Sequence, residues 1–141
     1  GAKTVKSAFG LTVTADITED ELNIADADAV VFPGGMPGAA NLAASPTVKN
    51  AITFALEHNR VIGAICAAPG VVLANTGALS GKNYTCFPGF EVSEGNYTAA
   101  KVERDGNLVT GNGPAAAAEF AAVVAGAITP KAEDLIRKMY K

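Results

Sequence analysis

The fold of this chain is decided by the stretch Val61-Ile62-Gly63-Ala64-Ile65-Cys66-Ala67-Ala68-Pro69-Gly70. Its first five residues form an apolar, largely β-branched run, which predicts a parallel strand buried on both faces. Pro69 suits the first turn of a helix, because proline lacks the N–H that a first-turn residue leaves unpaired. The stretch therefore predicts a strand that turns directly into a helix, with Cys66 at the turn.

A cysteine at such a turn is expected at the carboxyl end of the sheet, where it faces the free N–H groups of the helix. Those groups and the helix dipole favour an anion, so they would stabilise a thiolate and activate it as a nucleophile. The arrangement parallels the nucleophile elbow of hydrolases, although the G-x-S-x-G letters are absent. An inert core cysteine fits the residues equally well, because free cysteine is among the most buried residue types.

The composition indicates one globular domain of 141 residues: 49% of them are hydrophobic and 18% are charged. A net charge of −3 argues against nucleic acid or an anionic membrane as partner, and no apolar run reaches the roughly 18 residues of a membrane span. Cys66 and Cys86 could pair in principle, but a cysteine at a strand–helix turn is better interpreted as a free thiol of a reducing compartment, so we expect a cytoplasmic protein. With a single histidine and two widely spaced cysteines, no metal site is expected.

The pattern along the chain predicts parallel strands alternating with helices, which implies an open α/β sheet covered on both faces. Residues 91–98 are polar and are predicted to be irregular. The expected strands are residues 29–32, 61–65 and 83–87, and the expected turns and hairpins are a hairpin within residues 5–14 around Phe9-Gly10, a capped turn at residues 18–21 and a hairpin at residues 101–110 around Asp105-Gly106. The expected helices are one that starts at Pro46, one that follows Cys66, runs through Val72, Leu73 and Ala74 and ends at Gly77, and two that span residues 115–128 and 131–140.

Three turns follow predicted strands: Gly34-Gly35, Cys66-Ala67 and Gly113-Pro114. In an open α/β sheet, ligands bind beyond the carboxyl ends of the strands. The three turns together therefore predict one site at that edge of the sheet.

These segments resemble the DJ-1/ThiJ/PfpI superfamily. The Cys-Ala-Ala-Pro form of residues 66–69 is closest to the DJ-1/YajL branch. The matching pieces keep their order and spacing over nearly the whole chain: residues 30–35, 38–42, 64–69, 102–106 and 110–114. The resemblance implies a flavodoxin-like three-layer sandwich with a mostly parallel central sheet, forming one domain over residues 1–141. It also implies an N-terminal strand and helix that are missing from this chain.

Carried over by position, Cys66 is expected to be the reactive cysteine, with the backbone N–H groups of Gly35 and Ala67 as oxyanion donors. The loops that pack around the site are expected to be those of Gly34, Gly113 and Pro114. The resemblance implies glyoxalase III-like or deglycase-type chemistry on small reactive carbonyl compounds, without a cofactor, in a homodimer. Two alternatives stay open: a non-catalytic redox sensor or chaperone in which Cys66 becomes a sulfinate, and a PfpI-like intracellular peptidase.

Some positions depart from the family pattern. Ala67 stands where the peptidase branch has histidine, which removes the base of a Cys-His mechanism. Phe87 replaces a histidine common in DJ-1-like proteins, and Phe9 stands where some members place an arginine in a pocket shared by the dimer.

The only histidine, His58, is expected to be a cation at the C-terminal end of a helix and not a catalytic base. Cys86 is expected to be structural.

The resemblance places a glutamate that hydrogen-bonds the reactive cysteine upstream of Gly1. Without it we expect weak activity, and we expect a separate N-terminal segment to complete the fold. The carboxylates of Glu91, Glu94 and Glu119 are each expected to be solvated and not to replace that glutamate.

Overall fold

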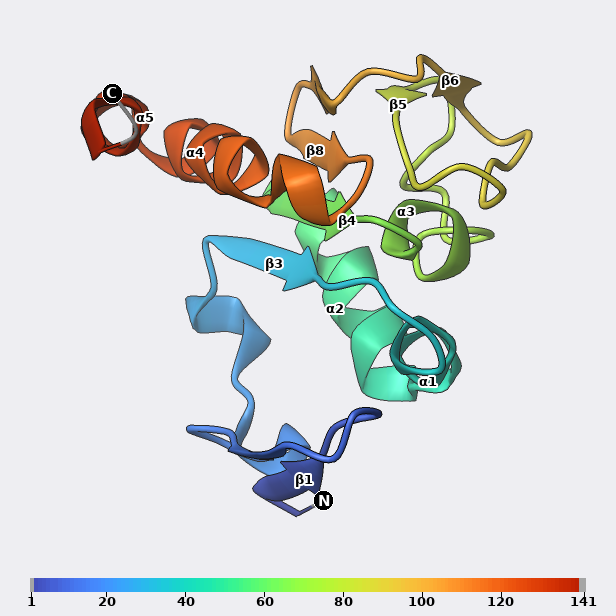
Figure 1. The fold of residues 1–141 in the computed structure, drawn as a ribbon, viewed down its shortest axis with the longest axis vertical. Helices are drawn as coiled ribbons and strands as arrows, with labels where there is room; N and C mark the ends of the chain where they lie inside the picture. Colours follow the sequence, from blue (N-terminus) through green and yellow to red (C-terminus); the bar gives the residue numbers. More distant parts are fainter. Residues whose placement is uncertain (1, 140–141) are drawn as a thin grey trace.

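A four-stranded sheet forms the centre of the computed structural model, which describes residues 2–139 (Figure 1). The strands lie in the order β3 (Ala29–Phe32), β4 (Val61–Ile65), β8 (Leu108–Gly111) and β7 (Val102–Asp105). The first three are parallel, and β7 pairs with β8 in antiparallel fashion. The sheet is therefore mostly parallel, as the sequence predicts.

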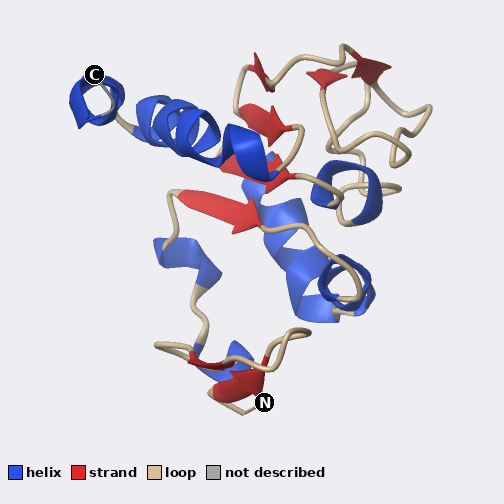
Figure 2. Ribbon diagram, viewed as in Figure 1, coloured by secondary structure: helices blue, strands red, loops and turns tan. Residues whose placement is uncertain are grey.

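Helices cover both faces of this sheet (Figure 2). Successive side chains of β4 point to opposite faces, so they pack against different helices. Ile62 belongs to a core cluster that includes residues of α2 (Pro46–Glu57), whereas Val61 packs in a second cluster with α4 (Ala117–Ile128). Gly63 lets α4 approach closely, since a Cβ atom there would lie 3.1 Å from Cζ of Phe120. The three layers confirm the predicted flavodoxin-like α/β class.

The remaining elements flank these layers. Figure 1 shows the N-terminal hairpin at the far end of the molecule from the C-terminal helices. The flanking elements are β1 (Thr4–Lys6), β2 (Thr12–Thr14), the 3-10 helices η1 (Glu19–Glu21), η2 (Ile24–Asp26) and η3 (Pro114–Ala116), the helices α1 (Gly38–Ala44), α3 (Ala68–Val71) and α5 (Pro130–Met139), and the short parallel pair β5 (Asn83–Tyr84) and β6 (Asn96–Tyr97). No helix within residues 2–139 has the length and apolar character to cross a membrane.

Most predicted elements are confirmed. The hairpins around Phe9-Gly10 and Asp105-Gly106 form, and Gly106 has the positive φ of 64° that such a turn needs. Ser45 caps the helix that begins at Pro46, with its Oγ accepting the N–H of Val48 at 3.3 Å. The predicted helix over residues 131–140 is α5, although Tyr140 lies outside the described residues.

The helix expected after Cys66, running through Val72, Leu73 and Ala74 to Gly77, is wrong in length, because α3 is a single turn that ends at Val71. Asn75 has a left-handed φ of 60° and donates its N–H to the Glu94 carboxylate at 2.7 Å, where a longer helix would use a backbone carbonyl. A tertiary contact thus overrides the local pattern. The strand at residues 83–87 is also shorter than predicted, and the segment predicted to be irregular contains β6.

Candidate active site

Cys66 directly follows β4 and has a left-handed backbone, with φ at 63°. Residues other than glycine rarely adopt this conformation, and it persists where the surroundings enforce it. Here the N–H of Cys66 donates to the carbonyl of Gly111 at 2.8 Å, and its own carbonyl accepts the N–H of Phe87 at 2.8 Å. These bonds hold a sharp turn at the end of the strand, and the free thiol of Cys66 is half-buried there.

The loop after β3 touches this turn at Gly34. A Cβ atom built on Gly34 would lie 2.6 Å from Cβ of Cys66 and 2.9 Å from the nitrogen of Ala67. Gly35 follows with φ at +85°, is exposed, and accepts the N–H of Ala39 at 2.8 Å. The structure therefore brings Gly34, Cys66 and Ala67 together at the carboxyl ends of β3 and β4. The oxyanion role of the N–H groups stays a prediction.

The third predicted loop reaches the same edge through Phe87. Gly113 is buried two residues after the end of β8, and a Cβ atom there would lie 3.2 Å from the Phe87 ring. Phe87 in turn donates its N–H to Cys66. Pro114 begins η3 and is exposed. All three predicted turns thus belong to one region.

The short length of α3 changes the electrostatic argument. A macrodipole is the sum of many aligned peptide units, and a single turn sums few of them. Individual N–H groups that lack a helical partner, such as that of Ala67 at the N-cap, are what this turn can offer to an anion. An anion at this turn would therefore depend on individual N–H groups more than on a helix dipole.

Cys86 lies in a different environment from Cys66. It is 0% exposed, in the same core cluster as Ala67 and Ala68. Burial, followed by the negative charges of Glu91 and Cys66, raises the pKa of the Cys86 thiol to about 11. Cys86 is therefore a packed, protonated thiol at neutral pH, consistent with the structural role predicted for it.

Two of the three carboxylates considered from the sequence are surface residues. Glu91 is exposed and accepts the N–H of Gly89 at 3.0 Å, and Glu119 is exposed and pairs with Lys101 at 3.2 Å. Glu94 is half-buried, and its carboxylate accepts the N–H of Asn75 at 2.7 Å. Among residues 2–139, no side chain hydrogen-bonds the sulfur of Cys66.

His58 lies at the C-terminal end of a helix, as predicted, and far from Cys66. It is the C-cap of α2 and stacks on Phe54, with ring centroids 4.0 Å apart. His58 precedes β4 and Cys66 follows it, so about 16 Å of extended strand separates them. This histidine cannot serve Cys66 as a base. The described part of the chain holds no group of three His, Cys, Asp or Glu side chains placed to bind a metal ion.

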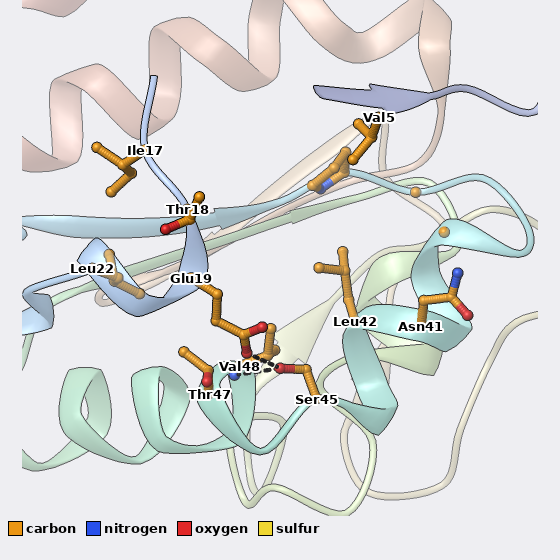
Figure 3. A pocket seen from close by; sticks show the side chains of 13 residues that line it. Val5, Ile17, Thr18, Glu19, Leu22, Asn41, Leu42, Ser45, Thr47 and Val48 are labelled. Carbon is orange, nitrogen blue, oxygen red and sulfur yellow. Dashed lines mark hydrogen bonds between the residues drawn. The ribbon is translucent and has the colours of Figure 1, made fainter. Parts of the chain in front are cut away.

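Two cavities border the Gly34 loop. One of about 470 Å³ is lined by Gly34, Gly35, Met36 and the hairpin residue Phe9, among others. The other, of about 660 Å³, lies between the N-terminal segment and the helices α1 and α2 (Figure 3). Both volumes are in the range of small-molecule sites.

Figure 3 shows the Glu19 side chain turned toward Ser45, whose hydroxyl donates to it at 2.9 Å. Hydrogen bonds from Thr47 and Ser45 lower the pKa of Glu19, so this carboxylate is ionised at neutral pH. Sequence reasoning did not single out Glu19 for this position, because the partners are 26 residues apart.

Comparison with known proteins agrees with this architecture. The chain is 36% identical over 114 residues to Protein DJ-1 homolog B of Arabidopsis thaliana, covering 79% of this chain and 26% of that protein. It is 31% identical over 121 residues to the glutathione-independent glyoxalase DJR-1.2 of Caenorhabditis elegans, covering 83% of this chain and 63% of that protein. The chain thus spans less than two thirds of the length of either relative.

A solved structure, that of Drosophila melanogaster DJ-1beta, superposes with a TM-score of 0.86 at 32% identity. The superposition covers 99% of this chain and 78% of the Drosophila chain. The model of the DJ-1/PfpI family matches residues 1–127. The chain therefore belongs to the DJ-1/PfpI family.

Proposed function

We propose that the chain uses the Cys66 thiolate as a nucleophile on small reactive aldehydes, in cofactor-free chemistry of the glyoxalase III or deglycase type. The observation that carries this proposal is the left-handed turn at Cys66, held against the backbone of Gly34. Cys66 is half-buried and not sealed in the core, which supports access by a small electrophile. The name of the C. elegans relative, a glutathione-independent glyoxalase, supports the same substrate class.

In this mechanism the Cys66 sulfur attacks the aldehyde carbon of a dicarbonyl such as methylglyoxal. A carbon–sulfur bond forms while the carbonyl π electrons move to the oxygen, and the N–H groups of Gly35 and Ala67 stabilise that oxyanion. Transfer of the C1 proton to C2 gives a thioester, and water then releases lactate and restores the thiolate. The proton transfers require a general base, a role that the family resemblance assigns to a glutamate upstream of Gly1.

The test is lactate formation from methylglyoxal, with no glutathione added. We expect Cys66→Ser to abolish lactate formation, because a hydroxyl is far less ionised than a thiol at neutral pH. The matched control is Cys86→Ser, which should retain activity because Cys86 is sealed in the core. Turnover that survives Cys66→Ser would contradict the proposal.

The half-buried free thiol also favours a second candidate function, a redox sensor or chaperone. A peroxide would then convert Cys66 to a sulfinate, and the same N–H groups would hold the new charge. This function requires a +32 Da adduct on Cys66 without aldehyde turnover. A PfpI-like peptidase is disfavoured by the position of His58, and hydrolysis of peptide substrates would revive it.

We propose further that a strand–helix segment completes the sheet, either in the same polypeptide or as a separate partner. β3 lies at an edge of the sheet, and Val31 on it is 49% exposed. The cavity of about 660 Å³ adjoins the loop that follows β3. An unpaired strand edge is a template for another strand. Native mass spectrometry that finds the 141-residue chain alone, monomeric and cooperatively folded would contradict this.

A homodimer is the expected assembly, and the exposed apolar residues near Gly35 support it. Phe9 is 97% exposed and Met36 is 54% exposed, and both line the same cavity as Gly35. A second copy that covers them would remove apolar surface from water. Phe9→Ser should therefore shift the protein toward monomer in analytical ultracentrifugation, and an unchanged sedimentation coefficient would count against this interface.

A further inference from the structure

We propose that Cys66 and Cys86 form an intramolecular disulfide after a hydroperoxide oxidises Cys66. The proposal rests on the reactivity proposed above for Cys66, and it adds Cys86 as the thiol that resolves the oxidised form. The 20-residue separation of the two cysteines in the sequence gives no sign of this pairing. Their proximity comes from the fold.

The backbone brings the two cysteines close together. The N–H of Phe87, which directly follows Cys86, donates to the carbonyl oxygen of Cys66 at 2.8 Å. With ordinary bond lengths on each side of that hydrogen bond, the two Cα atoms lie at most about 8 Å apart. Disulfides usually join Cα atoms that are about 4.4–6.8 Å apart, so this hydrogen bond holds the two cysteines at or near bridging distance.

Packing is consistent with this proximity, because Cys86 and the residues that directly follow Cys66, Ala67 and Ala68, belong to one core cluster. The charge of Cys66 also contributes to the raised pKa of Cys86, which places the two sulfur atoms within electrostatic reach. Both cysteines are free in this structure.

The difference in exposure assigns the two roles. Cys66 is half-buried and can meet a peroxide, whereas Cys86 is 0% exposed and cannot. The thiolate of Cys66 attacks one oxygen of the hydroperoxide, the O–O bond breaks, and an alkoxide or hydroxide leaves. Cys66 becomes a sulfenic acid, oxidised by two electrons, and the peroxide is reduced.

The sulfur of Cys86 then attacks the sulfur of the sulfenic acid. A sulfur–sulfur bond forms, the sulfur–oxygen bond breaks, and the leaving hydroxide takes up the thiol proton of Cys86 as water. Because Cys66 no longer carries a thiolate, the disulfide form cannot attack an aldehyde. The pair would thus switch off the proposed activity reversibly and would protect Cys66 from oxidation to the sulfinate.

The experiment treats the reduced 141-residue protein with two equivalents of hydrogen peroxide, enough to carry one cysteine to the sulfinate, blocks free thiols with iodoacetamide under denaturing conditions, and measures intact mass. The wild-type protein should lose 2 Da, as expected for one disulfide, and take up no label. Peptide mapping should find a linked pair that contains Cys66 and Cys86, and dithiothreitol should restore both thiols. The yield should not depend on protein concentration, because the bond is intramolecular.

Cys86→Ser serves as the matched variant, and it should accumulate a +32 Da sulfinate on Cys66 under the same conditions. A wild-type protein that gains +32 Da on Cys66 without the linked peptides would overturn the disulfide and leave the reactivity of Cys66 intact. A Cys66 that resists both peroxide and iodoacetamide in the folded protein would overturn the proposed function as well. Since peptide mapping uses the wild-type chain, the result does not depend on the folding of a variant.

Discussion

The backbone of Gly34 lies against the side chain of Cys66, so closely that a Cβ atom on Gly34 would be 2.6 Å from Cβ of Cys66. The same atom would lie 2.7 Å from the carbonyl oxygen of Ile65. Real Cβ atoms do not approach backbone atoms this closely, so only glycine fits the observed position. The contact joins the loop after β3 to the turn after β4.

Gly34→Ala should therefore push these two loops apart. We expect a loss of about 1–3 kcal/mol in the free energy of unfolding, typical of overpacking, and a several-fold change in the alkylation rate of Cys66 by iodoacetamide. Gly38→Ala is the control, since a Cβ atom there has nothing within 4 Å. Equal alkylation rates in the two variants would show that the contact does not position Cys66.

Gly70→Ala should be more damaging to stability. A Cβ atom at Gly70 would lie 1.7 Å from the carbonyl oxygen of Phe90, which is backbone and cannot rotate away. We expect the free energy of unfolding to fall by about 3 kcal/mol or more, at the high end for a single substitution. Urea denaturation measures this. A change within about 0.5 kcal/mol, the range of neutral surface substitutions, would show that the segment around Phe90 moves freely.

Thr110→Val should leave a buried donor without a partner. The N–H of Thr85 donates to Oγ1 of Thr110 at 2.9 Å, and both residues are 0% exposed. The loss of this bond should cost about 1–3 kcal/mol, the penalty for an unsatisfied buried group. Thr110→Ser keeps the hydroxyl and should lose less than Thr110→Val in the same urea experiment. The reverse order would mean that methyl packing outweighs the hydrogen bond.

Stability should fall at alkaline pH because of Cys86. Its folded-state pKa, about 11, lies above the ordinary cysteine pKa of 9.0, so the folded state retains a proton that the unfolded state gives up. The stabilisation is present below pH 9 and is lost as the pH rises toward about 11. In Cys86→Ala this contribution is absent. The stability advantage of the wild-type protein over the variant should therefore shrink between pH 8 and pH 11 in urea titrations, and a constant difference would contradict the shift.

The sequence predicts well those elements that local patterns determine. The apolar run that ends at Ile65 forms β4, and the Asp105-Gly106 turn forms the hairpin of β7 and β8. It fails where distant segments compete with the local pattern. The helix after Cys66 ends at Val71, and Asn75, which the pattern placed inside it, instead donates its N–H to Glu94, 19 residues away along the chain. No periodicity in residues 66–77 could show this contact.

In the candidate site, too, features set by local patterns were predictable and features set by contacts between distant segments were not. The three turns that meet near Cys66 were predictable, because the carboxyl ends of parallel strands share one edge of a sheet. The neighbourhood of Cys86 was not, since it depends on a hydrogen bond from a loop that follows the two-residue strand β5. Glu19 and Ser45 also meet only through the fold.

The left-handed backbone at Cys66 has a consequence for protein engineering. An ordinary side chain in this conformation costs roughly 1–2 kcal/mol, and glycine largely avoids that cost. A library screened for heat resistance would therefore favour glycine at position 66, whereas a library screened for thiol chemistry would keep cysteine. Selection for thermal stability and selection for thiol reactivity would therefore favour different residues at position 66.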